Sequence, residues 1–141
     1  MRLSKLFAFF SMISIIFAVA TATAGQQVRF DGQKIINAGD LSQATVTSSI
    51  VNLSTVTGYS IACAYSGSSP TGTLKIQVSN DFTEDSTAIS NWYDLPSSSQ
   101  SISANGNYVW AISDANYKWL KVLWTKTSGT GTINCFYGTK H

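Results

Sequence analysis

Residues 59–79, YSIACAYSGSSPTGTLKIQVS, decide the fold class of this chain. Large side chains alternate with small or polar ones over residues 59–65 and again over 74–78, which is the two-residue period of strands with one buried face. The connection, residues 67–72, combines glycines and serines with a proline, and this chemistry is typical of turns. The stretch therefore predicts a β-hairpin and, with it, an all-β domain.

The same alternation recurs along the rest of the chain, separated by stretches rich in Gly, Asn, Asp and Ser. No helical or heptad period is present after residue 25. About eight short strands at this spacing predict an antiparallel β-sandwich of the jelly-roll type. Trp110 and Trp124 are expected in its core. The expected strands cover residues 26–36, 44–53, 59–65, 74–78, 92–95, 108–112, 119–124 and 133–137.

The first 24 residues have the pattern of an export signal. A short basic start precedes the apolar run Leu6–Ala20, and the small residues Ala22 and Ala24 form an A-x-A cleavage pattern. An uncleaved anchor is the alternative, but the apolar run is shorter than the roughly 20 residues that span a bilayer. We therefore expect a signal peptide over 1–24, a single domain over 25–141 with no stable membrane span, and a secreted, periplasmic or cell-surface location.

Charge excludes one class of partner. The chain has nine basic and seven acidic residues, and two of the basic residues, Arg2 and Lys5, lie in the predicted signal. The remaining charges balance, and the basic residues are scattered, so the basic cluster that nucleic-acid binding needs is missing. Low net charge also weakens electrostatic protection against association. We therefore expect a homo-oligomer and no nucleic-acid partner.

Cys63 and Cys135 are the only cysteines, and both lie on the apolar side of an expected strand. In an oxidising compartment, two cysteines in one small domain usually pair. The sequence thus predicts a Cys63–Cys135 disulfide. Two buried free thiols are the alternative.

Motifs for catalysis or cofactor binding are missing from the sequence. The only histidine, His141, is the last residue, where surrounding structure cannot hold it as a catalytic base. The acidic stretch with Asp81, Glu84 and Asp85 is expected to be a solvated loop, with a cation site built on oxygen ligands as a weaker alternative. We therefore expect a protein that is not an enzyme and that holds no cofactor.

Aromatic residues offer the better indication of a site. Exposed Trp and Tyr rings serve as flat apolar platforms for sugar rings, while neighbouring amides and carboxylates supply hydrogen bonds. Trp119 and Leu123 are alternatively candidates for a subunit interface, where large apolar side chains are enriched. The candidate ligand-binding residues are Asn80, Asp81, Trp92, Tyr93 and Tyr117, all expected in loops or on outward strand faces, as is Trp119.

Three segments, GTLKIQVSND (72–81), NWYDLP (91–96) and residues 106–138, carry a family resemblance. Together they resemble jelly-roll modules of phage virion proteins, tail-fibre tips and head decorations, and small exported bacterial β-sandwich proteins. A fainter similarity is to the discoidin or galactose-binding sandwich. The resemblance implies a non-enzymatic module for assembly or attachment, often trimeric. The predicted signal peptide and disulfide depart from virion modules and favour an exported cellular protein.

These patterns lead to two functional hypotheses. The first is an exported structural or adhesive surface module that associates with itself, with a trimer favoured. The second is a lectin-like carbohydrate-binding module that uses exposed Trp and Tyr and recognises surface glycans.

Overall fold

The structure is a computed structural model that describes residues 30–140. The predicted signal peptide (1–24) and His141 lie outside the described residues. Nearly all the regular structure is β, as predicted from the sequence. The elements are β1 (Phe30–Asp40), β2 (Thr45–Thr47), β3 (Val51–Asn52), β4 (Gly58–Ser79), the 3₁₀ turn η1 (Ser86–Ala88), β5 (Tyr93–Asp94), β6 (Gln100–Ile102), β7 (Gly106–Ile112) and β8 (Trp119–Lys140).

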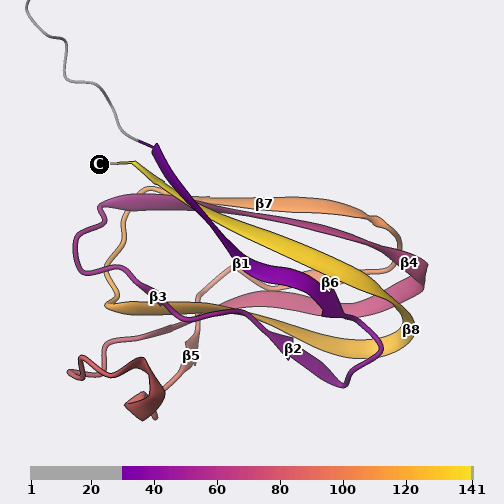
Figure 1. The fold of residues 1–141 in the computed structure, drawn as a ribbon, viewed down its shortest axis with the longest axis horizontal. Helices are drawn as coiled ribbons and strands as arrows, with labels where there is room; N and C mark the ends of the chain where they lie inside the picture. The colour runs from indigo at the N-terminus through magenta and orange to yellow at the C-terminus, as the bar shows by residue number, and fades with distance from the viewer. Residues whose placement is uncertain (1–29, 141) are drawn as a thin grey trace, which may run out of the picture.

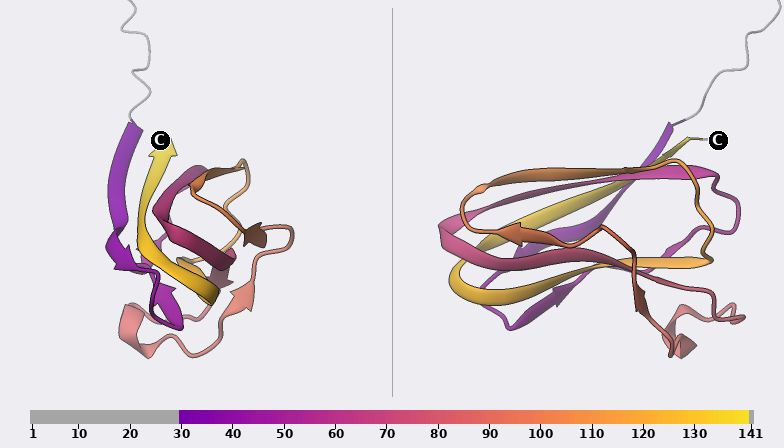
Figure 2. Two further views of the ribbon diagram at one scale, coloured as in Figure 1. Left: turned by 90° about the vertical axis from the view of Figure 1, so that its right-hand side faces the viewer. Right: turned by 180° about the vertical axis from the view of Figure 1, so that it is seen from behind.

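Two strands of 22 residues each, β4 and β8, organise the fold. They pair antiparallel from Gly58↔Lys140 to Ser79↔Trp119, and the resulting ribbon bends once near its middle (Figures 1 and 2). Each strand therefore contributes half its length to each of two layers. The first layer has the order β1-β8-β4-β7; in the second, β2 and β3 pair with β8 while β5 and β6 pair with β4. The result is an all-β, antiparallel, sandwich-like fold of eight strands.

The expected hairpin within residues 59–79 is wrong. Its two halves belong to one strand, and they pair with β8 rather than with each other. The turn-rich residues 67–72 bend the strand instead of reversing it, and the register with β8 shifts at this point. Likewise, the expected strands 119–124 and 133–137 are the two halves of β8. A strand that bends and a chain that reverses in a hairpin both need glycine-rich residues. Only the strand with which this segment pairs shows which of the two it forms.

The bend depends on glycines where the two strands cross closely. Gly129 has a φ of +77°, in the left-handed region that side-chain-bearing residues disfavour. Gly67 and Gly131 pair across the ribbon, and a Cβ on either would collide with the other strand's backbone. At Gly72, an added Cβ would lie 2.7 Å from ring carbons of Trp124. These glycines therefore allow both the tight bend and the large buried ring beside it.

The core fills the space between the two layers, because alternate residues of β4 and β8 point inward in both halves. The apolar faces expected from alternation are buried, and Trp110 and Trp124 lie in the core as predicted. Burying one such aliphatic or aromatic side chain stabilises the fold by about 1.5–3 kcal/mol. The buried hydrophobic residues of the two long strands are Tyr59, Ile61, Cys63, Tyr65, Leu74, Ile76 and Val78 in β4, and Trp119, Leu120, Val122, Trp124, Ile133, Cys135 and Tyr137 in β8.

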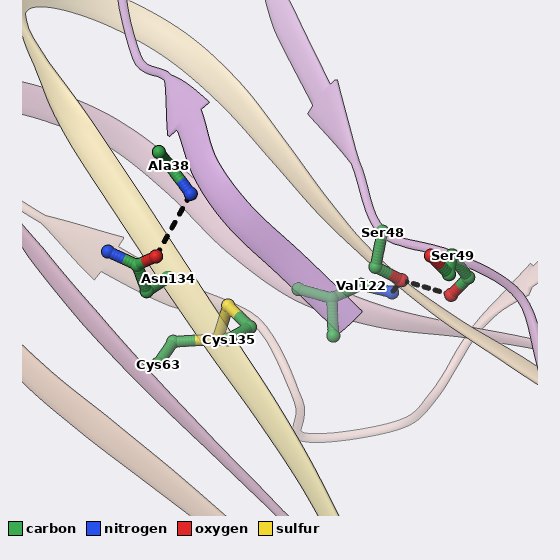
Figure 3. Close-up of a disulfide and its surroundings, with 7 residues drawn as sticks. All are labelled: Ala38, Ser48, Ser49, Cys63, Val122, Asn134 and Cys135. Atoms are coloured by element: carbon green, nitrogen blue, oxygen red, sulfur yellow. Dashed lines mark hydrogen bonds between the residues drawn. A yellow bond between two sulfur atoms is a disulfide. The ribbon is translucent and has the colours of Figure 1, made fainter. Parts of the chain in front are cut away.

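The predicted Cys63–Cys135 disulfide is confirmed. The two residues are direct partners across β4 and β8, with a Cα–Cα distance of 4.1 Å and a sequence separation of 72 (Figure 3). Each is no more than 1 % exposed. The bond therefore links the first layer from inside the core. Disulfides of this buried kind are typical of proteins that mature in an oxidising compartment.

A buried serine ties the segment after β2 to β8. Ser48 is 7 % exposed, and its Oγ accepts a hydrogen bond from Val122 N at 2.8 Å while donating to Ser49 O at 2.7 Å (Figure 3). Both capacities of the hydroxyl are used, so its burial carries no desolvation penalty from an unpaired polar group. This contact fixes the edge of the second layer.

Candidate functional site

The loop of residues 80–92 folds over one end of the second layer, and Asp81 is its centre. The Asp81 carboxylate accepts hydrogen bonds from Ser90 N at 2.8 Å, Asn91 N at 3.0 Å and Asn91 Nδ2 at 2.9 Å. Asn80 Oδ1 accepts from Lys118 N at 2.9 Å. Asn80 and Asp81, predicted to bind ligand, thus use these hydrogen bonds to hold the loop together and to attach it to Lys118.

Trp119 is not exposed, although strand alternation places it on the outward side of β8, as expected from the sequence. Trp119 is only 4 % exposed, and its indole Nε1 donates to the Asp81 carbonyl at 3.2 Å. Strand alternation alone would point it to solvent, but the 80–92 loop is bonded to it. Trp119 therefore packs within its own chain, which leaves little of the ring for a subunit interface.

The acidic residues of the loop are used separately. Glu84 pairs with Lys118 at 2.6 Å, and Asp85 caps η1 by accepting from Thr87 N at 2.8 Å. Within residues 30–140, no group of three His, Cys, Asp or Glu side chains is placed to hold a metal ion. Asp81, Glu84 and Asp85 therefore do not form the cation site considered from the sequence.

Acidification is expected to release this loop. Hydrogen bonds from Asn91, and then from Ser90, hold the pKa of Asp81 below its usual 3.8. Because the folded-state pKa is depressed, the carboxylate stabilises the loop fully above the unfolded value, and this contribution is lost as pH falls through the folded value. The indole N–H NMR signal of Trp119, which bonds to Asp81, should therefore shift below about pH 3.8.

The matched variants for this pH titration are Asp81→Asn and Asp40→Asn. Asp40 also has a lowered pKa, caused mainly by its hydrogen bonds with Ser42, but it lies at the end of β1. The Trp119 transition should disappear in Asp81→Asn and persist in Asp40→Asn. An unchanged transition in Asp81→Asn would contradict the assignment.

Trp92 lies on the outer face of the second layer, over Lys121. The Lys121 Nζ is 4.1 Å from the centroid of the Trp92 ring, within the range of a cation–π contact. Both side chains are half-buried, and burial lowers the pKa of Lys121. The contact holds the indole in place at the end of the 80–92 loop.

A row of polar side chains continues from Lys121 across the sheet. Gln77 in β4 pairs with Lys121 in β8 on one side and with Asp94 in β5 on the other. Asp94 accepts hydrogen bonds from Gln77 Nε2 at 2.8 Å and from Lys75 Nζ at 2.7 Å. These two bonds, that from Lys75 first, lower the pKa of Asp94 and keep it ionised.

We call Trp92, Lys121, Gln77, Lys75 and Asp94 the Trp92 face. It has one aromatic ring, at the end of the 80–92 loop, beside two cations, one carboxylate and one amide on β4, β5 and β8. The half-buried Leu123 adjoins it, because Leu123 pairs with Lys75. An arrangement of this kind can stack an apolar ring face while donating and accepting hydrogen bonds around it.

The structure separates Tyr93 and Tyr117 from Trp92. Tyr93 is 65 % exposed, but it precedes Asp94 in β5 and therefore points to the opposite side of that strand. Tyr117 is half-buried against the core near Tyr59. Burial raises the pKa of Tyr59 to about 12, and the neighbouring Tyr137 and Tyr117 add to the shift. The three predicted platform rings thus do not form one surface.

A depression of about 380 Å³ lies at the ends of β4, β7 and β8. None of its lining residues is charged and none was predicted to bind ligand. The lining residues are Thr57, Gly58, Tyr59, Ser60, Ile112, Ser113, Gly138 and Thr139.

Sequence reasoning missed Lys75, Gln77, Asp94 and Lys121 as site residues. A signal for three of them was present, because Lys75 and Gln77 alternate with buried Leu74 and Ile76, and Lys121 alternates with buried neighbours in β8. Their convergence with Trp92 depends on the pairing of β4 with β8 and β5, which no local pattern reveals.

No protein-family model and no curated protein sequence matches this chain. Several solved structures resemble it in fold. The SPBc2 prophage-derived protein YomS has a TM-score of 0.46 at 13 % identity, with 81 % of this chain and 95 % of that one covered. A chitosan-binding module from a chitosanase/glucanase of Paenibacillus sp. IK-5 has a TM-score of 0.44 at 18 % identity, with 78 % and 93 % covered.

A third structure, of infectious bursal disease virus strain Gx, has a TM-score of 0.42 at 11 % identity, with 81 % of this chain and 32 % of that one covered. All three TM-scores are below 0.5, and the fold described above rests on the strand pairing of this chain alone. Among residues 30–140, no helix is long and apolar enough to cross a membrane.

Proposed function

We propose that this protein is an exported, non-enzymatic attachment module that binds polysaccharide through the Trp92 face. One observation carries the proposal: Trp92 is held 4.1 Å from Lys121, in line with the hydrogen-bonded pair of Gln77 and Asp94. The ring offers an apolar stacking surface, and the fixed polar groups beside it can bond to sugar hydroxyls.

The geometry suits an extended chain better than a small molecule. The polar residues of the Trp92 face lie on paired strands, and none of them lines the depression described above, whereas pockets that enclose a small ligand are concave. An extended polysaccharide can lie across β5, β4 and β8 and contact Asp94, Gln77 and Lys121 in turn. The buried disulfide supports maturation outside a reducing compartment, and we infer a secreted, periplasmic or cell-surface location.

Binding to a panel of polysaccharides tests the proposal. The panel contains cellulose, chitin, xylan and bacterial peptidoglycan, and bound protein is measured by co-sedimentation. Trp92→Ala is expected to weaken binding at least about tenfold, because stacked aromatic residues are the usual hot spots of such contacts. Gln77→Ala should weaken it less, since it removes one amide and its hydrogen bond to the Asp94 carboxylate but leaves the Trp92 ring in place.

The neighbouring Tyr93→Ala is the matched control. It removes an exposed aromatic ring of similar size one residue away, but on the opposite side of β5. Its binding should equal that of the unaltered protein. Equal losses for Trp92→Ala and Tyr93→Ala, or no binding to any member of the panel, would contradict the proposed site.

A further inference from the structure

Lys121 is the one charge of the Trp92 face that has no counter-charge. The other lysine of the face, Lys75, is bonded to the Asp94 carboxylate at 2.7 Å. Within residues 30–140, the Lys121 ammonium group makes no salt bridge and donates no hydrogen bond, and its Nζ lies 4.1 Å from the Trp92 ring centroid. With two ammonium groups and one carboxylate, the face therefore carries one excess positive charge, beside its aromatic ring.

The acidic residues of the neighbouring 80–92 loop have partners of their own. Glu84 pairs with Lys118 at 2.6 Å, while Asp81 and Asp85 accept hydrogen bonds from groups within the loop. None of these carboxylates forms a salt bridge with Lys121. An anion from outside the chain can therefore contact Lys121 without displacing a carboxylate of the protein.

Partial burial makes the missing counter-charge costly. Lys121 is half-buried, and burial lowers its pKa from the usual 10.5 because desolvation penalises the charged form. The Trp92 ring attracts the cation only through its quadrupole, since the ring has no formal charge. A carboxylate brought by a ligand would form a charge-assisted hydrogen bond, which is roughly twice as strong as a neutral one.

Gln77 adds a second donor beside Lys121. The two residues are direct partners across β4 and β8. The Gln77 amide has two N–H groups, and one of them donates to the Asp94 carboxylate at 2.8 Å. Among the described residues, no acceptor is bonded to the other N–H. A carboxylate on this face can therefore accept hydrogen bonds from Lys121 and Gln77 together.

We propose that the polysaccharide bound by the Trp92 face is acidic and built of uronic acid units, with a carboxylate paired to Lys121. A uronic acid carries its carboxylate directly on the sugar ring. One unit can therefore pack against the exposed part of Trp92 and reach an ammonium group 4.1 Å from the ring centroid. The inference rests on the proposed function, because it names the class of polymer that the same site prefers.

Two forms of one polymer test this preference by isothermal titration calorimetry. Polygalacturonate and its fully methyl-esterified form share a backbone and differ in charge. The unaltered protein should bind the acid form at least about tenfold more tightly, because only that form makes the charge-assisted contact. Raising NaCl from about 20 mM to about 300 mM should reduce this ratio, since salt screens a partly exposed ion pair.

Substitutions of lysine assign the preference to one residue. Lys121→Gln should reduce the affinity ratio to about twofold or less, while Lys121→Arg, which keeps the charge, should retain most of it. Lys34→Gln is the matched control. It removes the same charge from a lysine that also lies over an aromatic ring, with its Nζ 5.4 Å from the Phe136 centroid, but it lies on β1 in the first layer. Its ratio should equal that of the unaltered protein.

Equal affinities of the unaltered protein for the two forms, or no binding to either, would overturn the inference. An equal decrease of the ratio in Lys34→Gln would also overturn it, as would binding to dextran sulfate as tight as to polygalacturonate, because attraction to any polyanion would then suffice. A thermal unfolding curve confirms that each variant is folded.

The inference and the proposed function fail separately. If Lys121→Gln weakens binding to both forms equally and keeps the ratio, Lys121 only holds Trp92 in place. The inference is then wrong while the polysaccharide site stands. If the acid form is preferred but Trp92→Ala binds it as tightly as the unaltered protein does, the Trp92 face is not the binding site.

Discussion

Gly129→Val is expected to remove a large part of the stability of this domain. At Gly129 the φ of +77° is disfavoured for any β-branched residue, and the new Cβ would lie 2.8 Å from the Ser68 carbonyl oxygen and closer still to Ser69. Backbone strain and overpacking each cost about 1–3 kcal/mol, so a loss of about 4 kcal/mol in the free energy of unfolding is expected. Small domains have only about 5–15 kcal/mol in total.

Chemical denaturation measures this loss, with Gly106→Ala as the control. A Cβ at Gly106 would make only ordinary contacts, the nearest at 3.6 Å to Tyr65. Gly106→Ala should therefore change the free energy of unfolding by less than about 1 kcal/mol. If Gly129→Val unfolds at the same denaturant concentration as Gly106→Ala, the bend does not require a left-handed backbone conformation at residue 129.

Removing the disulfide is expected to have an effect of similar size. The Cys63–Cys135 bond closes a loop with a sequence separation of 72, and the chain-entropy model assigns such a bond about 4 kcal/mol. For a domain of this size, the loss corresponds to a decrease in Tm of about 15 °C. The double variant Cys63→Ala/Cys135→Ala and the reduced unaltered protein should both show it by calorimetry.

Reductant gives the internal control for the disulfide. It should lower the Tm of the unaltered protein and leave that of the double alanine variant unchanged. If reductant frees both thiols of the unaltered protein but leaves its Tm unchanged, the bond does not stabilise the fold.

Sequence patterns predicted much of this fold, because the side of a strand on which a residue lies depends only on its near neighbours in the sequence. The inward residues of both long strands and the core positions of Trp110 and Trp124 follow from two-residue alternation, while the Cys63–Cys135 pair follows from the cysteine count and the expected oxidising compartment. The hairpin expected around residues 67–72 was wrong because the glycine-rich chemistry is compatible with a bend as well as a turn. Pairing with β8, more than 50 residues away, decides between them.

The site was harder to predict because each of its contacts joins distant segments. Trp119 is outward by alternation, yet its indole bonds to Asp81, 38 residues away. Trp92 and Tyr93 are adjacent in sequence, and successive side chains of an extended segment point to opposite sides. The polar row beside Trp92 exists only because β5, β4 and β8 are neighbours in the sheet.

Indole NMR signals test the binding face most directly. The chain has four tryptophans, and three of them, Trp110, Trp119 and Trp124, are no more than 5 % exposed. A ¹⁵N-labelled sample is titrated with a soluble oligosaccharide cut from whichever polysaccharide retains the protein in co-sedimentation. We predict a large shift of the Trp92 indole N–H signal, with the three buried indoles nearly unchanged. Saturable binding that leaves the Trp92 signal in place would contradict the assignment of the Trp92 face.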